Sequence, residues 1–386
     1  MITLRALNRA TLARQMLLER SSATALEALE RVAGLQAQEA KPPYIGLWTR
    51  LATFDKNDLL DIVRSREAVR VTAMRGTLHV MSTRDYLAFR PGMQPVLDAA
   101  INSILKNRGE GIDVDAFVEQ ARAYFRGRSA TFNDLRAELE KTNPGIDIRA
   151  AAYAARLKLP LVLTPDSAPW GWTNDPEFTL ASTWLGVDVP TVDLRADDAT
   201  PNLLPLPHRE GSRGTSGGGF PAFILRYLGA FGPATVADFQ TWSGLKGAKD
   251  AFERLRPQLV TFIGDKKREY FDLPDAPRPD EDTPAPVRFL PDFDNLMLGH
   301  NDRTRVIKDE YRQRVATANL RTLATFLVDG ITAGTWKTEV KKKTAKLLLD
   351  PFEPLTRADI DALVDEGERL LRFIEPEAKG YEVSAR

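Results

Sequence analysis

The chain has 386 residues, of which 43% are hydrophobic and 27% charged, as in an ordinary soluble protein with room for roughly two to four domains. Its 53 basic and 53 acidic residues balance, so the composition does not indicate a general attraction to nucleic acid. The absence of cysteine excludes disulfides and thiolate zinc sites and fits a reducing cytosol; the three histidines lack metal-ligand spacing, and no stretch approaches the roughly 18 apolar residues of a membrane span.

Residues 1–110 are predicted to form a first unit of helices followed by a hairpin. A first helix is expected over residues 9–20, and Thr24 and Glu27 make a T-x-x-E start signal for a second helix. Alternating residues in VTAMRGTLHVMS then predict two strands around Gly76.

Two glutamines, Gln36 and Gln38, follow the second predicted helix in the sequence GLQAQEAKPPY. Pro42 and Pro43 disfavour helical backbone just before them, so a short non-helical segment can direct both amides into one space. Glutamine does not titrate, but it can hold a water molecule or hydrogen-bond a base edge. The residues alone leave three roles open, namely a surface or capping role, contact with a base, and catalysis.

Residues 111–186 repeat the same order of elements. DVDAFVEQARAYFR has apolar residues at helical spacing, Thr131 and Asp134 start a second helix, and IDIRAAAYAARLKL predicts a third. LVLTPDSAPWGWTNDPEFTL then predicts a hairpin with a proline-rich tip.

Residues 220–273 give the clearest copy, after a Pro/Gly-rich linker over 187–219. FPAFILRYLGAF predicts one helix, Thr235 and Asp238 start another that Gly244 ends, and KGAKDAFERLRPQL predicts a third. LVTFIGDKKREYFDL predicts the hairpin. Three helices followed by a hairpin are the plan of a winged helix, so the repeated pattern predicts three tandem winged helices.

A second linker over 274–287 leads into a different composition over 288–386. Strand and turn patterns dominate there, and an amphipathic helix capped by Thr356 and Asp359 follows them. The sequence therefore predicts an α+β protein with a β-rich C-terminal domain.

Six segments, spread over nearly the whole chain, carry a resemblance to a known family: LNRATLARQMLL, VAGLQAQEAKPPYIGLWTRL, MRGTLHVMS, GPATVADFQTWSGL, LPDFDNLMLGHNDR and FLVDGITAGTWK. In this order they resemble the AlkZ/YcaQ family of winged-helix DNA glycosylases. The resemblance implies three tandem winged-helix domains plus a C-terminal β-barrel-like domain, curved around a DNA channel.

The family's catalytic motif maps onto Gln36, Ala37 and Gln38, although Ala37 stands where larger apolar residues can stand. The Gln-x-Gln form resembles the AlkZ branch, which is linked to N-alkylated purines and interstrand crosslinks. The resemblance implies a monofunctional DNA glycosylase of bacterial base excision repair that hydrolyses the N-glycosidic bond of N7- or N3-alkylated purines in double-stranded DNA. Unhooking of interstrand crosslinks is left open. No metal or other cofactor is expected, and the protein is expected to be monomeric, not bound to membranes, cytoplasmic and associated with the nucleoid.

Candidate DNA contacts follow from position in the predicted hairpins. They are Arg75 and His79 in the first hairpin, Lys266, Lys267 and Arg268 at the turn of the third, and Lys341, Lys342 and Lys343 after the Trp336 strand. Each has a structural alternative, since a basic hairpin tip can simply be solvated and a histidine can simply be packed.

Two other classes of function remain. A non-catalytic winged-helix DNA-binding regulator fits the fold prediction, because fold does not fix function. A protein- or RNA-binding role fits the zero net charge. A metal-dependent nuclease is poorly supported, because the acids of LPDFDN and NDR form no evident ligand cluster.

Overall fold

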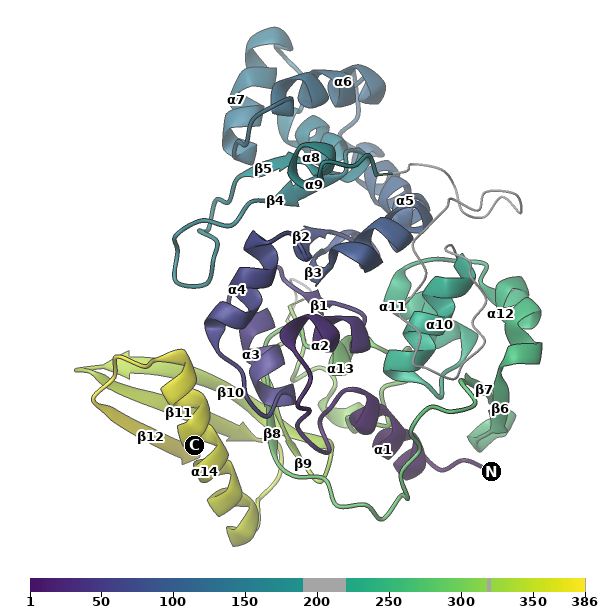
Figure 1. Ribbon diagram of the computed structural model, residues 1–386, viewed down its shortest axis with the longest axis vertical. Helices are drawn as coiled ribbons and strands as arrows, with labels where there is room; N and C mark the ends of the chain where they lie inside the picture. Colours follow the sequence, from purple (N-terminus) through teal and green to yellow (C-terminus); the bar gives the residue numbers. More distant parts are fainter. Residues whose placement is uncertain (190–219, 318–320, 386) are drawn as a thin grey trace.

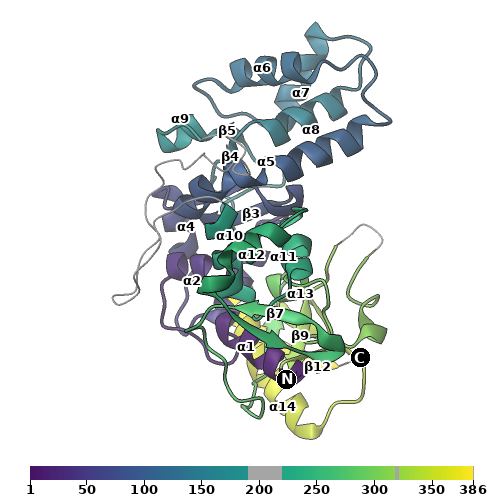
Figure 2. The same ribbon diagram turned by 90° about the vertical axis from the view of Figure 1, so that its right-hand side faces the viewer.

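The computed structural model describes residues 1–189, 220–317 and 321–385 (Figures 1 and 2). The predicted α+β class is confirmed: the described chain has two five-stranded sheets, a two-stranded hairpin and helices in every part. From residue 190 on, the predicted linker over 187–219 lies outside the described residues. Among those that are described, no helix is both long and apolar enough to cross a membrane.

The first part of the chain holds more helices than the sequence predicted. Its elements are α1 (Leu4–Arg14), α2 (Ala25–Arg31), β1 (Leu35–Gln36), α3 (Pro42–Arg50), α4 (Lys56–Arg64), β2 (Ala68–Thr72), the 3-10 turn η1 (Met74–Gly76), β3 (Leu78–Ser82) and α5 (Thr83–Leu105). The predicted capping box of Thr24 and Glu27 is present at α2. The first helix, however, begins at Leu4, where Thr3 caps it by accepting a hydrogen bond from the Ala6 N–H, and it ends at Arg14.

The second part continues the sheet of the first. Its elements are α6 (Val114–Phe125), α7 (Phe132–Thr142), α8 (Ile148–Lys158), β4 (Leu161–Leu163), β5 (Phe178–Leu180) and α9 (Ala181–Leu185). The sheet order is β1-β3-β2-β4-β5, with β2 residue Arg70 opposite β4 residue Leu163. β2 lies between β3 and β4, so neither of its edges is open to solvent, and every one of its residues is buried.

The third part contains three helices and a separate hairpin, as the sequence predicted. These are α10 (Phe220–Phe231), α11 (Val236–Ser243), α12 (Lys249–Leu255), the turn η2 (Arg256–Gln258), β6 (Val260–Ile263), the turn η3 (Asp265–Lys267) and β7 (Glu269–Asp272). Thr235 and Asp238 form the predicted capping box, and Gly244 ends α11 in the left-handed conformation with φ 82°. Aromatic rings, among them Phe223 and Trp242, fill the core between these helices.

The C-terminal part is an open sheet, and the predicted barrel-like domain is wrong. It comprises β8 (Arg288–Leu290), α13 (Asn295–Leu298), η4 (Asp309–Tyr311), β9 (Thr325–Val328), β10 (Ile331–Lys341), β11 (Thr344–Pro351), α14 (Arg357–Ile374) and β12 (Gly380–Ala385). In the described residues the order β12-β11-β10-β9-β8 leaves β12 and β8 as separate edges. Alternate residues of β10 and β11 are buried, and α14 contributes Leu363, Leu370 and Leu371 to the same core. A covering helix thus buries the apolar face, and the sheet does not have to close on itself.

Buried arginines join parts that are distant in sequence. In α1, Arg14 makes two bonds to Asp272 at the end of β7, at 2.7 and 2.8 Å. In α3, Arg50 makes two bonds of 2.8 Å to Asp294, and both side chains are fully buried. Figure 1 accordingly shows α1 between the third part and the C-terminal sheet.

Candidate active site around Gln36 and Gln38

The segment that carries the glutamines is pinned in an extended form. Gly34 follows α2 with φ 82°, and a Cβ there would lie 3.2 Å from the Val80 carbonyl oxygen, so glycine allows the close entry into β1. The Ala37 N–H donates to the Leu78 carbonyl at 2.7 Å. On the other side, Arg70 Nε donates to the Ala37 carbonyl at 3.0 Å.

Each glutamine is oriented by one hydrogen bond to its side-chain oxygen. Gln36, which is 7% exposed, accepts from the Arg75 guanidinium at 2.9 Å, and the exposed Gln38 accepts from the Leu78 N–H at 3.2 Å. A guanidinium and a backbone N–H can only donate, so these partners decide which end of each amide is the oxygen. Each oxygen keeps a second lone pair. The fully buried Ala37 side chain lies between the two, so the alternation of an extended segment places both amides on the face opposite Ala37, where Gln36 is buried and Gln38 is exposed.

Arg75 connects this segment to the third part of the chain. It lies in the turn between β2 and β3 with φ 56°, a left-handed conformation that is uncommon for a residue with a side chain. One terminal nitrogen donates to Gln36 and the other to the Trp242 carbonyl near the end of α11. Burial and the nearby Arg303 charge lower the pKa of Arg75 to about 10, so the group is still cationic at pH 7. The structure therefore places this predicted DNA contact in hydrogen bonds within the protein.

His79 lies opposite Gln36 in the β1–β3 pairing and is 1% exposed. Its Nδ1 is 3.1 Å from the Thr77 carbonyl oxygen, which only accepts, so Nδ1 carries the proton. Burial and the charge of Arg75 lower the pKa of His79 to about 3, and the ring is neutral at pH 7. Its Nε2 is buried without a hydrogen-bond partner in the described structure.

The predicted lysine contacts lie at the tips of two hairpins. Lys266 and Lys267, at φ 55° and 57°, are exposed between β6 and β7, and Lys342 and Lys343, at φ 49° and 67°, are exposed between β10 and β11. Figure 1 shows these hairpins on opposite sides of the α1–α3 region. The structure thus does not gather them with the glutamines into one patch.

Two of the predicted basic contacts have acidic partners. Arg268 is ion-paired with Asp302, and Lys341 lies 2.8 Å from a Glu339 carboxylate oxygen. The Arg268 and Lys341 side chains are 42% and 73% exposed, and such surface pairs are weak enough for a phosphate to compete.

Sequence reasoning missed the residues that hold the site in place. Arg70 fixes the backbone after Gln36, and Arg303 adds a second positive charge near Arg75. Arg303 stands within the segment LPDFDNLMLGHNDR, which carried the family resemblance, but nothing in its pattern pointed toward the glutamines. Among the residues described, no group of three or more His, Asp or Glu side chains is arranged to hold a metal ion.

Comparisons with known proteins agree with one another. A family model described as DNA glycosylase AlkZ-like matches residues 29–373. A relative from Streptomyces sahachiroi named interstrand DNA cross-link repair glycosylase is 24% identical over 387 residues, covering 93% of this chain and 93% of that one. The solved structure of Streptomyces sahachiroi DNA glycosylase AlkZ has a TM-score of 0.74 at 21% identity and covers 100% of both chains, so the fold is shared.

Proposed function

Since this chain belongs to the AlkZ-like DNA glycosylase family, we propose that it hydrolyses the N-glycosidic bond of N7- or N3-alkylated purines in double-stranded DNA, with Gln36 and Gln38 as its catalytic residues. One observation carries the assignment of these residues. Both amides stand on a short segment pinned by β3 and Arg70, and each has its oxygen fixed by a donor of the protein.

The chemistry suits neutral amides. An alkyl group on N7 or N3 gives the purine a positive charge, so the base departs neutral and needs little proton donation. The sugar passes through an oxocarbenium-like transition state, as in other glycoside cleavage. The free lone pairs of the Gln36 and Gln38 oxygens would hold a water molecule against C1′, and the amide dipoles would stabilise part of the developing positive charge. An intact, uncharged base should not be released.

Binding of the duplex is proposed to use three winged-helix units over residues 1–110, 111–186 and 220–273, followed by the C-terminal sheet. The exposed lysines at the two hairpin tips would contact phosphates. A chain that carries several such units has no need of a second copy to span DNA, so it is proposed to act as a monomer at the nucleoid.

Interstrand crosslinks are proposed as a further substrate because the Streptomyces sahachiroi relative is named for their repair. The non-catalytic regulator is not favoured, because the chain belongs to a glycosylase family over most of its length.

Release of N7-methylguanine from a defined duplex, measured as strand breaks in alkali at the abasic site, tests the proposal. Gln36→Ala and Gln38→Ala should each lose most of the single-turnover rate while still binding the duplex. A wild-type protein that binds DNA but releases neither N7-methylguanine nor N3-methyladenine, nor unhooks an N7–N7 crosslink, would overturn the proposed substrates.

A further inference from the structure

Arg303 is a half-buried arginine whose side chain has no partner in the described part of the chain. Its Nε is buried without a hydrogen bond, and its terminal nitrogens form neither a hydrogen bond nor an ion pair with any described residue. Burial and the charge of Arg312 lower the pKa of Arg303, and no carboxylate among the described residues offsets them. Withdrawing a guanidinium from water without a counter-charge costs free energy that the fold does not recover. Arg303 is therefore better explained by binding an anion than by stabilising the protein.

The backbone is fixed on both sides of Arg303. Before it, Asp238 accepts a hydrogen bond from the Asn301 N–H at 2.9 Å. After it, the Val306 and Ile307 N–H groups both donate to the Arg303 carbonyl at 2.9 Å. A side chain on such a segment is preorganised, because its Cα does not have to be ordered when a ligand binds.

The end of α11 joins the Arg303 segment to the proposed catalytic site. The Thr241 hydroxyl donates to the side-chain oxygen of Asn301 at 3.3 Å, and the carbonyl of the next residue, Trp242, accepts from Arg75. Arg75 in turn bonds the first of the two proposed catalytic amides. The charge of Arg303 accordingly acts on Arg75 and helps to lower its pKa. Arg303 therefore lies in the surroundings of the glutamine segment.

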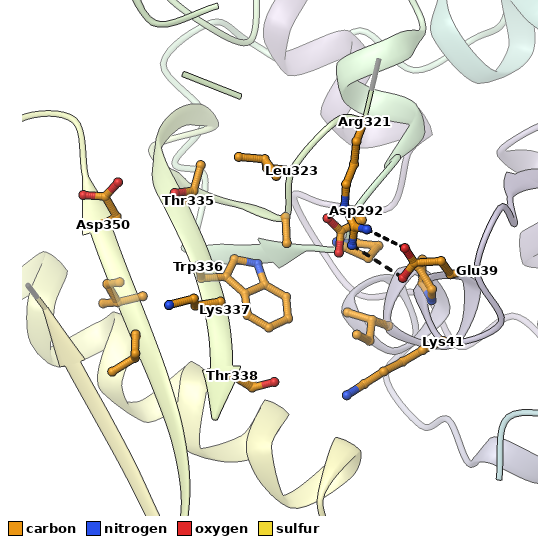
Figure 3. A pocket seen from close by; sticks show the side chains of 16 residues that line it. Glu39, Lys41, Asp292, Arg321, Leu323, Thr335, Trp336, Lys337, Thr338 and Asp350 are labelled. Atoms are coloured by element: carbon orange, nitrogen blue, oxygen red, sulfur yellow. Dashed lines mark hydrogen bonds and ion pairs between the residues drawn. The ribbon is translucent and has the colours of Figure 1, made fainter. Parts of the chain in front are cut away.

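The first acid after the glutamines is already paired. Glu39 accepts from Arg321 at 2.5 Å, and Arg321 also donates to Asp292 at 3.0 Å (Figure 3). No carboxylate acts on Arg75 or on Arg303 within the described ranges. The surroundings of the glutamine segment thus carry two arginine charges that the described protein does not compensate.

This excess of positive charge opposes the proposed reaction while no anion is bound. The alkylated base is cationic and the sugar gains positive charge in the transition state, so nearby like charges raise the free energy of both. A DNA strand carries a phosphate on each side of the lesion nucleotide, and a guanidinium binds phosphate oxygens through charge-assisted hydrogen bonds. Resting on the proposed function, we propose that Arg303 binds the phosphodiester group on one side of the lesion nucleotide. The bound phosphate compensates the arginine pair and holds the sugar against the Gln36–Gln38 segment.

The test combines removal of the cation with removal of the anion. Arg303→Met removes the charge and keeps most of the side-chain volume. In the DNA, a neutral methylphosphonate replaces the phosphate on the 5′ side or on the 3′ side of one N7-methylguanine, in two otherwise identical duplexes. Arg312→Met is the matched control, because Arg312 is exposed, acts on Arg303 through its charge and is ion-paired with Asp309 at 3.3 Å. The readout is kcat/KM for base release, and thermal melting shows whether each variant is folded.

For the wild type, the neutral linkage at one of the two positions should lower kcat/KM by roughly 10- to 150-fold, as expected for the loss of a hydrogen bond between charged groups. Arg303→Met should lose a similar factor on the unmodified duplex. The neutral linkage should then change its kcat/KM by less than about twofold, because both changes remove the same contact. Arg303→Gln should behave in the same way and serves if the Met variant does not fold. Arg312→Met should stay as sensitive to the linkage as the wild type.

Two results would overturn the phosphate site while leaving the proposed function intact. One is a folded Arg303 variant that loses the same factor as the wild type at the neutral linkage. The other is a wild type that releases the base equally well from the unmodified duplex and from both methylphosphonate duplexes. A wild-type protein that releases no base from the unmodified duplex would instead overturn the proposed function, on which this site rests.

Discussion

Removing the guanidinium of Arg75 tests whether the orientation of Gln36 matters for the reaction. In Arg75→Met the side chain keeps most of its volume, but the 2.9 Å hydrogen bond to the Gln36 oxygen is lost. A hydrogen bond to a charged group contributes about 1.5–3 kcal/mol, and about 1.4 kcal/mol corresponds to a tenfold change in rate. If the full contribution acts in the transition state, the single-turnover rate of base release should fall by roughly 10- to 150-fold.

The assay separates orientation of Gln36 from contact with DNA. Single-turnover release at saturating enzyme reports on the chemical step, and fluorescence anisotropy with an undamaged duplex reports on binding. Arg75→Lys keeps the positive charge but replaces the planar fork, whose two terminal nitrogens bond Gln36 and the Trp242 carbonyl separately, by one ammonium nitrogen, so its rate should be intermediate. Thermal melting shows whether either variant is folded. An Arg75→Met protein that weakens binding but keeps the wild-type rate would refute the reasoning and make Arg75 a DNA contact.

Three further predictions concern stability, pH and DNA affinity. Asp294→Leu leaves the fully buried Arg50 charge without its partner and should lower the free energy of unfolding, measured by urea titration, by about 3–5 kcal/mol. The double variant Arg50→Met/Asp294→Leu should recover most of this loss, and equal stabilities of the single and double variants would contradict the reasoning. His79 has a pKa of about 3 in the fold and an ordinary value of 6.5 when unfolded, so between these values the unfolded chain binds more protons and stability falls as the pH is lowered. His79→Gln should therefore lose less stability than wild type between pH 7 and pH 4.5, and parallel curves would argue against a neutral buried ring. Lys266→Glu/Lys267→Glu should weaken binding of all duplexes alike and reduce the salt dependence, which anisotropy at several salt concentrations measures; unchanged affinity would show that the tip is only solvated.

Local chemistry made several helix starts predictable from sequence. The capping boxes of Thr131 with Asp134 and of Thr235 with Asp238 are present as predicted, because a cap depends on residues three apart. The hairpin between β6 and β7 also follows from short-range alternation and its turn. Such short-range contacts depend on only a few neighbouring residues, so the sequence pattern alone predicts them.

Long-range geometry was the part that the sequence did not reveal. Pairing of β2 with β4 joins segments about ninety residues apart, and no local pattern specifies that partner. The barrel prediction failed for the same reason, since the strand pattern did not show that α14 covers the sheet. The sequence also did not reveal the hydrogen bond from Arg75 to the Trp242 carbonyl, because the left-handed turn and this contact depend on the assembled fold.

The anchors of the glutamine segment also set when it can form during synthesis on the ribosome. Asn295 donates to the Val32 carbonyl, 263 positions earlier, at 3.1 Å, and Asp294 compensates Arg50, 244 positions earlier. Until residues 294 and 295 leave the exit tunnel, Arg50 lacks the carboxylate of Asp294 that compensates its buried charge. The Val32 carbonyl, just before β1, also lacks the hydrogen bond from the Asn295 amide. A nascent chain stalled before this point would lack these two contacts around the Gln36–Gln38 segment. If the proposed catalytic role of the glutamines holds, activity is expected only after more than three quarters of the chain has been made.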